Sequence, residues 1–160
     1  MRMRGFVALL IVLMLSNSAY SMKNGFGIGL IIGEPTGFIV KKWLAENTAV
    51  DGAVAWSFDG RDALHLHGDY LVHDFTLLQN EQNFNKGRLP VYYGLGARVK
   101  FKDDSHDDDL KFGIRVPLGI SYIPSQHPLD FFVEVVPTMD FAPDTELDLS
   151  AAVGMRYYFE

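Results

Sequence analysis

The sequence lacks several features that would place it in common protein classes. It has no cysteine in 160 residues, which excludes disulfide bonds and removes the usual acceptor for a lipid anchor after export. It has 14 basic residues against 20 acidic ones and no basic stripe, which argues against nucleic-acid binding. Beyond residue 21 it has no apolar run of the roughly 20 residues that a membrane-spanning helix needs. Any passage across a membrane must therefore be made by β-strands.

The first 21 residues have the pattern of a secretory signal peptide. Two arginines precede an apolar run over 6–15, and the small residues Ala19 and Ser21 stand where a signal peptidase requires them. A membrane anchor would need about twice as many apolar residues. We therefore expect export, cleavage after Ser21, and one mature β-barrel domain over 22–160.

Large apolar residues alternate with small or charged residues along most of the mature chain, as in KFGIRVPLGISY over 111–122. This alternation predicts β-strands with one apolar and one polar face, and short turns rich in Gly, Pro, Asp and Asn separate them. The predicted strands are 26–33, 37–44, 49–58, 64–75, 89–101, 110–123, 129–142 and 146–159. The predicted fold class is therefore all-β, an eight-stranded antiparallel up-and-down barrel.

The apolar face of these strands is too bulky to lie inside such a barrel. In each of the last four predicted strands, one phase holds seven uncharged, mostly apolar residues, and the other phase holds glycines and charged residues. A barrel of about eight strands leaves an interior that side chains just fill, and glycine suits its cramped concave side. We therefore expect the apolar face to point outward into lipid, which makes this a transmembrane β-barrel.

Aromatic residues gather at the two ends of the expected apolar band. Transmembrane barrels carry such aromatic girdles at their two interfaces with water. One predicted girdle comprises Phe101, Phe112 and Phe141, and the other comprises Tyr122, Phe131, Tyr157 and Phe159.

The mature chain resembles the small eight-stranded outer-membrane barrels of the OmpA/OmpX type. The resemblance rests on the signal peptide, the eight alternating strands and a last strand that ends Arg156-Tyr157-Tyr158-Phe159. It implies a location in the bacterial outer membrane, contact with outer-membrane lipid, and recognition of the terminal aromatic by the barrel-insertion machinery, although Glu160 follows that aromatic here. The phrases GEPTGFIVKKWL, VYYGLGAR and GIRVPLGISY also resemble an uncharacterised family of exported small barrels, which implies no established activity.

Six basic and six acidic residues on the polar face are expected to line the barrel interior. Charges in a confined interior are costly unless partnered, so the favoured interpretation is a set of salt bridges that brace a filled interior. A narrow ion path is the alternative. From strand height, Glu134 is expected beside Arg115 or Arg98, and Asp130 beside Arg156. The twelve residues are Lys41, Asp51, Asp69, Arg98, Lys100, Lys111, Arg115, Asp130, Glu134, Asp140, Asp148 and Arg156.

Three other patterns suggest chemistry without completing a site. His65, His67 and Asp69 share one strand face, but no further metal ligand can be placed, so we predict no metal. The segment KDDSHDDD at 102–109 lacks the spacing of a calcium loop and is expected to be a solvated surface loop, available to an extracellular ligand. Ser57 and His65 flank a turn but belong to no triad, so we predict no catalytic residue and no cofactor.

Two features fit the barrel less well. Pro117 and Pro137 lie within predicted strands, where we expect bulges. The longest connection, 76–88, falls on the periplasmic side if both termini are periplasmic, which reverses the usual asymmetry.

The sequence thus favours an integral outer-membrane barrel with a structural or surface-adhesion role. Two alternatives stay open. One is a soluble periplasmic barrel of lipocalin type that binds an apolar ligand, and the other is an outer-membrane barrel enzyme that modifies lipid A.

Overall fold

The computed structural model describes residues 25–57, 63–78, 87–104, 107–142 and 144–159, so the predicted signal peptide lies outside the described residues. Ten strands are assigned in this part of the chain. They are β1 (Phe26–Gly33), β2 (Thr36–Trp43), β3 (Thr48–Ser57), β4 (Ala63–Asp74), β5 (Gly87–Arg88), β6 (Val91–Asp104), β7 (Asp107–Arg115), β8 (Leu118–Pro124), β9 (Leu129–Ala142) and β10 (Glu146–Phe159).

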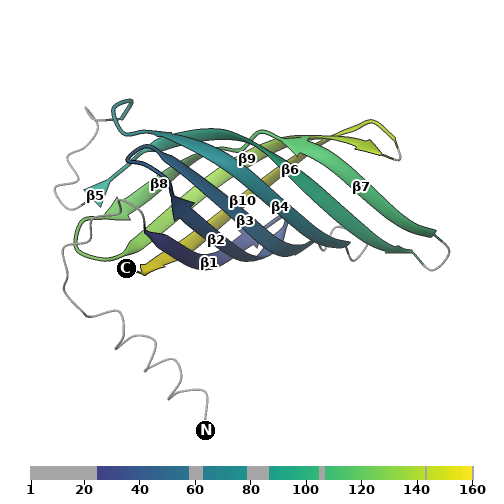
Figure 1. The fold of residues 1–160 in the computed structure, drawn as a ribbon, viewed down its shortest axis with the longest axis horizontal. Helices are drawn as coiled ribbons and strands as arrows, with labels where there is room; N and C mark the ends of the chain where they lie inside the picture. The colour runs from purple at the N-terminus through teal and green to yellow at the C-terminus, as the bar shows by residue number, and fades with distance from the viewer. Residues whose placement is uncertain (1–24, 58–62, 79–86, 105–106, 143, 160) are drawn as a thin grey trace, which may run out of the picture.

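The strands close into a ring. All pairings are antiparallel: β1 to β4 pair in chain order, β4 pairs with β6, β6 with β7 and β9 with β10, and β1 pairs with β10, from Phe26 with Phe159 to Gly33 with Ala152. β7 and β8 together occupy one position between β6 and β9, and β5 adds a short edge to β8, so the ring has eight positions. Figure 1 shows the tilted barrel, with the C-terminus beside the start of β1. The predicted fold class is confirmed.

The end of the barrel at which β1 begins and β10 ends is called the terminal end below, and the opposite end is called the hairpin end. At the hairpin end, β6 and β7 continue beyond the neighbouring strands (Figure 1), with Lys102 paired with Asp109 and Asp104 with Asp107. The prediction of a loop over 102–109 is therefore wrong for most of that segment. The segment is rich in charged residues and shows no apolar alternation, so the sequence did not indicate that its backbone continues the β6–β7 hairpin.

The predicted bulges at Pro117 and Pro137 are also wrong. Both prolines lie where β7 gives way to β8 alongside β9, and the register between the strands is the same before and after the break. The flanking pairs are Arg115 with Thr138 and Leu118 with Val135. A register shift between β7 and β9 lies instead between Phe112 and Gly113.

Each proline keeps one half of its ladder pairing, which explains why no extra residue is needed. The Val116 N–H donates to the Pro137 carbonyl at 3.0 Å, and the Gly94 N–H donates to the Pro117 carbonyl at 3.0 Å. The return bond is missing because proline has no N–H to donate. At each proline one ladder hydrogen bond is therefore missing, but the strand continues in the same register.

The two faces of the sheet differ sharply in chemistry. The outer face exposes large apolar side chains on every strand of the ring, among them Leu30, Phe38, Leu95 and Val133. The predicted girdle residues lie on this face, exposed or half-buried, with Phe101, Phe112 and Phe141 towards the hairpin end and Tyr122, Phe131, Tyr157 and Phe159 towards the terminal end. The inner face is buried and carries most of the charged residues that the strands contribute.

The connection that follows β4 folds back on the terminal end. The Asp74 carboxylate accepts hydrogen bonds from the Thr76 N–H at 2.7 Å and the Thr76 hydroxyl at 2.6 Å, and these bonds hold the pKa of this exposed carboxyl below its usual value. After the segment 79–86, which lies outside the described residues, β5 pairs with the end of β8, and the Arg88 guanidinium lies 4.9 Å from the centre of the Phe75 ring. This connection therefore returns to the barrel wall beside the end of β4.

No helix long and apolar enough to cross a lipid bilayer occurs in the described ranges of the chain.

The pairing around Pro137 makes the effect of Pro137→Val predictable. The new N–H would face the Val116 carbonyl and be protected from hydrogen exchange. Its bond contributes about 0.5–1.5 kcal/mol, which the lost rigidity of proline in the unfolded chain largely offsets, by about 0.4–1 kcal/mol. We expect the free energy of unfolding in urea to change by less than about 1 kcal/mol. A freely exchanging amide at position 137, or a loss of more than about 2 kcal/mol, would contradict the assigned register.

Candidate functional site in the barrel interior

The most unusual feature of the barrel interior is the number of buried charges. Nine charged residues are buried among the described residues, and they come from β2, β3, β4, β6, β7, β9 and β10. The basic ones are Lys41, Arg98, Arg115 and Arg156, and the acidic ones are Asp51, Asp69, Asp130, Glu134 and Asp140. Apolar side chains fill space between them, including Ile31, Ile39, Leu71 and Phe132.

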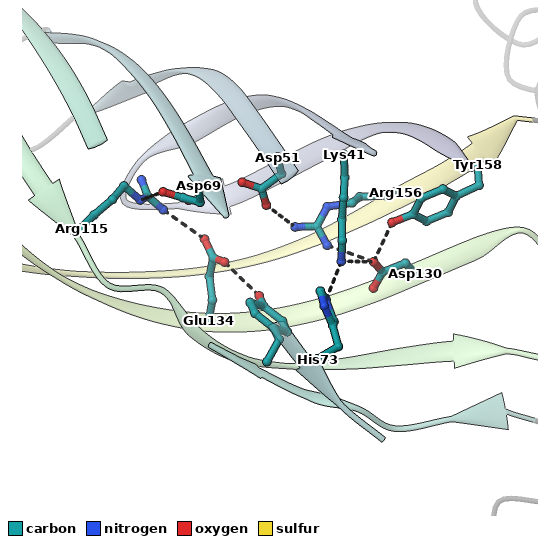
Figure 2. A network of polar contacts seen from close by, with 10 residues as sticks. Lys41, Asp51, Asp69, His73, Arg115, Asp130, Glu134, Arg156 and Tyr158 are labelled. Carbon is teal, nitrogen blue, oxygen red and sulfur yellow. Dashed lines mark hydrogen bonds and ion pairs between the residues drawn. The ribbon is translucent and has the colours of Figure 1, made fainter. Parts of the chain in front are cut away.

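Asp130 is the centre of the charge cluster nearest the terminal end. Its Oδ2 lies 3.0 Å from Arg156 Nη1 and 3.4 Å from Lys41 Nζ, and it accepts a hydrogen bond from the Tyr158 hydroxyl at 3.2 Å. Asp130, Lys41 and Arg156 are wholly buried, and Figure 2 shows them converging from three strands. One carboxylate therefore compensates two cations in a region without water contact.

Lys41 also contacts aromatic side chains. Its Nζ lies 2.9 Å from Nε2 of His73, 4.6 Å from the centre of the Trp43 ring and 5.6 Å from that of Tyr92. The Trp43 and His73 rings are 4.4 Å apart. These rings surround the ammonium group with π-faces, which attract a cation and exclude water from it.

A second cluster forms around Arg115 near the middle of the barrel. Arg115 Nε lies 3.0 Å from Asp69 Oδ1, and Arg115 Nη2 lies 3.7 Å from Glu134 Oε1. The Tyr92 hydroxyl donates a hydrogen bond of 2.9 Å to Glu134 Oε2. Glu134 thus has a cation on one oxygen and a hydroxyl on the other.

Asp51 extends the terminal-end cluster towards the middle of the barrel. Its Oδ2 lies 3.4 Å from Arg156 Nη2, and the same guanidinium lies 3.7 Å from the centre of the Phe132 ring. Arg156 therefore contacts two carboxylates, which Figure 2 shows, and also the face of the Phe132 ring.

The third cluster lies towards the hairpin end, where the interior opens to solvent. Arg98 donates to both oxygens of Asp140, at 3.0 and 2.7 Å, and to Asp148 at 2.8 Å. Lys111 pairs with Glu146 at 2.6 Å, and Asp148 and Glu146 are partly exposed. The paired forks of a guanidinium and a carboxylate form the strongest kind of charge-assisted contact.

All twelve residues predicted to line the interior lie on strands. Eleven of them belong to the three clusters described above, and Lys100 is the twelfth. Asp130 lies beside Arg156, and Glu134 lies beside Arg115, whereas Arg98 lies with Asp140 and Asp148. Lys100 is half-buried and faces Lys111 and His65 in register on the neighbouring strands.

Several interior groups escaped the sequence reasoning. His73 continues the alternation of His65, His67 and Asp69 along β4, and that continuation is the signal that would have found it. Tyr92 and Tyr158 sit on the inner face although aromatic residues were expected outside. Glu146, which pairs with Lys111, lies at the first position of β10.

Glycines on the inner face make room for these large side chains. A Cβ on Gly119 would lie 2.3 Å from Cζ of Tyr92, and a Cβ on Gly96 would lie 1.8 Å from Oδ1 of Asp69. Any other residue at these two positions would displace the side chain that lies across it. The polar face is therefore rich in glycine because its neighbours are large.

The histidines of β4 are buried. His65 and His67 face the interior, and Asp69 between them and the terminal end is held by Arg115. Among the residues that the structure describes, no three His, Asp or Glu side chains are placed to hold a metal ion.

Asp130→Asn tests whether the terminal-end cluster stabilises the barrel. The substitution leaves Lys41 buried without a carboxylate partner and Arg156 with Asp51 alone, which we expect to lower the free energy of unfolding by about 3–5 kcal/mol. The measurement is urea-induced unfolding in detergent, followed by the gel mobility of unheated samples. The matched control is Asp148→Asn, whose partner Arg98 keeps Asp140 and for which we expect a loss below about 1 kcal/mol. Equal losses in the two variants would refute a special role for the buried cluster.

Gly119→Ala tests the packing of Tyr92 against the inner face. The added methyl group must push the Tyr92 ring away from Glu134, and we expect a loss of about 1–3 kcal/mol in the same unfolding assay. Gly68→Ala is the matched control, because a Cβ there would meet nothing closer than the Asp51 carbonyl oxygen at 3.6 Å. Adding Tyr92→Leu to Gly119→Ala should cost less than the two separate losses combined. A simple sum of the two losses would exclude the proposed contact.

No protein-family model matches the chain, and no curated protein matches it in sequence. Among solved structures, it is similar to the N-terminal β-barrel domain of Pseudomonas aeruginosa OprF, with a TM-score of 0.63 at 12% identity over 86% of this chain and 98% of that chain. A second match is Neisserial surface protein A, with a TM-score of 0.48 at 12% identity over 85% of this chain and 94% of that chain. The likeness to the OprF domain shows the fold, and at that level it confirms the resemblance drawn from the sequence.

Proposed function

We propose that this chain is an integral outer-membrane β-barrel whose interior is packed and braced by salt bridges, with a structural or surface role. The observation that carries the proposal is an inverted distribution of polarity. Buried side chains include nine charged residues, whereas exposed side chains include large apolar residues on every strand of the ring. A barrel in water requires the opposite arrangement.

The outer face supports insertion into lipid. Soluble monomers rarely expose an apolar patch larger than a few hundred Å². Here Ile32, Phe38, Leu95 and Leu149 are each exposed by more than three fifths of their surface. The pairing of β1 with β10 closes the ring of strands, as a sheet in hydrocarbon requires. A lipocalin-type barrel would instead keep its apolar residues for the interior and its ligand.

The interior supports a bracing role. In the described residues each of the four buried bases lies within 4 Å of at least one carboxylate, and the space between them is taken by aromatic and aliphatic side chains. Such pairs join strands that are distant around the ring, as Arg156 of β10 joins Asp51 of β3. They therefore connect strands that no backbone ladder joins directly.

The two ends of the barrel suggest separate roles. Phe159, the last residue of β10, lies on the outer face beside Phe26, where the barrel-insertion machinery would meet it. The β6–β7 hairpin extends from the opposite end and carries the acidic segment 102–109. With both termini periplasmic, that hairpin is the part of the barrel that reaches furthest towards an external ligand.

The two tryptophans provide a direct test of orientation. Trp56 is on the outer face and 43% exposed, whereas Trp43 is in the interior and 2% exposed. In vesicles of lipids with brominated acyl chains, we expect strong quenching of tryptophan fluorescence in Trp43→Phe, which keeps Trp56. We expect little quenching in Trp56→Phe, which keeps Trp43.

Both variants are first shown to fold by their shifted gel mobility without heating. Vesicles of the same lipid without bromine provide the baseline. Quenching of Trp43 rather than Trp56 would favour a soluble barrel that holds apolar chains inside, and the absence of quenching from both would mean that the protein does not enter the bilayer.

A further inference from the structure

Two buried carboxylates face each other across neighbouring strands. Asp51 on β3 and Asp69 on β4 are direct register partners, and both are more than nine-tenths buried. Residues directly opposite in an antiparallel pair have Cβ atoms about 4.5–5.5 Å apart, and like charges there are destabilising. The register therefore places the two buried carboxyl groups side by side on the inner face of the sheet. Two full negative charges at this distance, without water, are an unfavourable arrangement.

Each carboxylate has one oxygen that accepts no hydrogen bond. Asp51 uses Oδ2 for Arg156, and its Oδ1 has no donor. Asp69 Oδ1 lies 3.0 Å from Arg115 Nε, but their geometry is that of an ion pair without a hydrogen bond. Buried acceptors are rarely left without a donor. A single hydrogen atom between the two carboxyl groups would supply the donor that the pair lacks.

The charge balance around the pair also lacks one positive charge. The groups that face it are Lys41 from β2, Arg115 from β7, Glu134 from β9 and Arg156 from β10, while β6 presents Gly96. Asp130 offsets only one of the two charges of Lys41 and Arg156, so with Arg115 and Glu134 included, three cations face four carboxylates. With every acid ionised, the buried charges that the structure describes amount to five negative and four positive.

The neighbouring histidines are poor sources of the missing charge. His73 Nε2 lies 2.9 Å from the Lys41 ammonium, so this nitrogen must accept a hydrogen bond and the ring is neutral. His67 is two residues from Asp69 and lines a small cavity together with Arg115, whose charge would repel an imidazolium. His65 lies further along β4, opposite Lys100.

We propose that Asp51 and Asp69 together bind one proton at neutral pH, as a carboxylic acid hydrogen-bonded to a carboxylate. The site is a proton-binding site in the barrel wall, and it depends only on the interior geometry. It would therefore stand even if the barrel proved not to enter a membrane.

The proton couples the stability of the barrel to pH. In the unfolded chain both carboxyls are ionised at pH 7, so the folded state holds one more proton than the unfolded state. The pair's contribution to folding is therefore largest at lower pH, and on its own it raises the unfolding equilibrium constant about tenfold per pH unit as pH increases, until the proton is released. Buried neutral histidines contribute with the opposite sign below about pH 6.5, and they do so equally in the variants compared below.

The first test is infrared spectroscopy of the folded protein in detergent at pH 7, with aspartate labelled with ¹³C at the side-chain carboxyl. We expect a carbonyl band of a protonated carboxylic acid in the unsubstituted protein, absent from both Asp51→Asn and Asp69→Asn. Asp148→Asn is the control and should keep the band. A folded protein without this band, or a band that survives both substitutions, would overturn the proposal.

The second test is the pH dependence of urea unfolding between pH 5 and pH 7. Each asparagine variant should fold, because its amide can donate to the remaining carboxylate as the shared proton does. For each rise of one pH unit, we expect the unfolding constant of the unsubstituted protein and of Asp148→Asn to increase about tenfold more than that of either Asp51→Asn or Asp69→Asn. Identical slopes in all four proteins would show that the pair binds no proton.

Discussion

The narrowness of an eight-membered ring of strands governs the rest of this structure. A ring of about eight strands has an interior that one layer of inward side chains fills, so every inward residue must fit the space its neighbours leave. Closure by β1 and β10 leaves no edge at which the sheet could relax. Large inward groups such as Tyr92 therefore lie over glycines such as Gly119, and the bulk that cannot be housed faces outward.

The same narrowness determines the electrostatics. Inward charges have no water to solvate them, so they must be met by opposite charge, by hydroxyl groups or by π-faces. Asp130 meets its two cations from β2 and β10, and Lys41 is enclosed by rings as well. Breaking such a pair is costly even where forming it contributes little, because one charge then remains buried alone. Substituting one member of a buried pair therefore costs more free energy than the intact pair contributes to stability.

The sequence contained the ring but little of its internal pairing. β9 and β10 were predicted with their observed bounds, because uninterrupted alternation specifies a strand and its two faces. Strand height judged from the sequence placed Asp130 beside Arg156 but was too coarse to separate Arg98 from Arg115 as the partner of Glu134. The prediction of bulges at the prolines was wrong because a missing N–H donor does not by itself require an extra residue. Each proline carbonyl keeps its hydrogen bond, and the register stays the same across the break. His73 and Tyr92 were missed because interior residues were sought among charged side chains, and the alternation along each strand was not applied to these two residues.

The fit between inner glycines and the side chains across them bears on how such a barrel changes over evolutionary time. A larger residue at position 119 requires a smaller one at position 92, and a smaller residue there also takes the hydroxyl donor from Glu134. A substitution inside the barrel therefore changes what its neighbours must supply, while the outer face needs only to stay apolar. The OprF domain has the same fold at 12% identity, so the fold does not depend on one particular sequence.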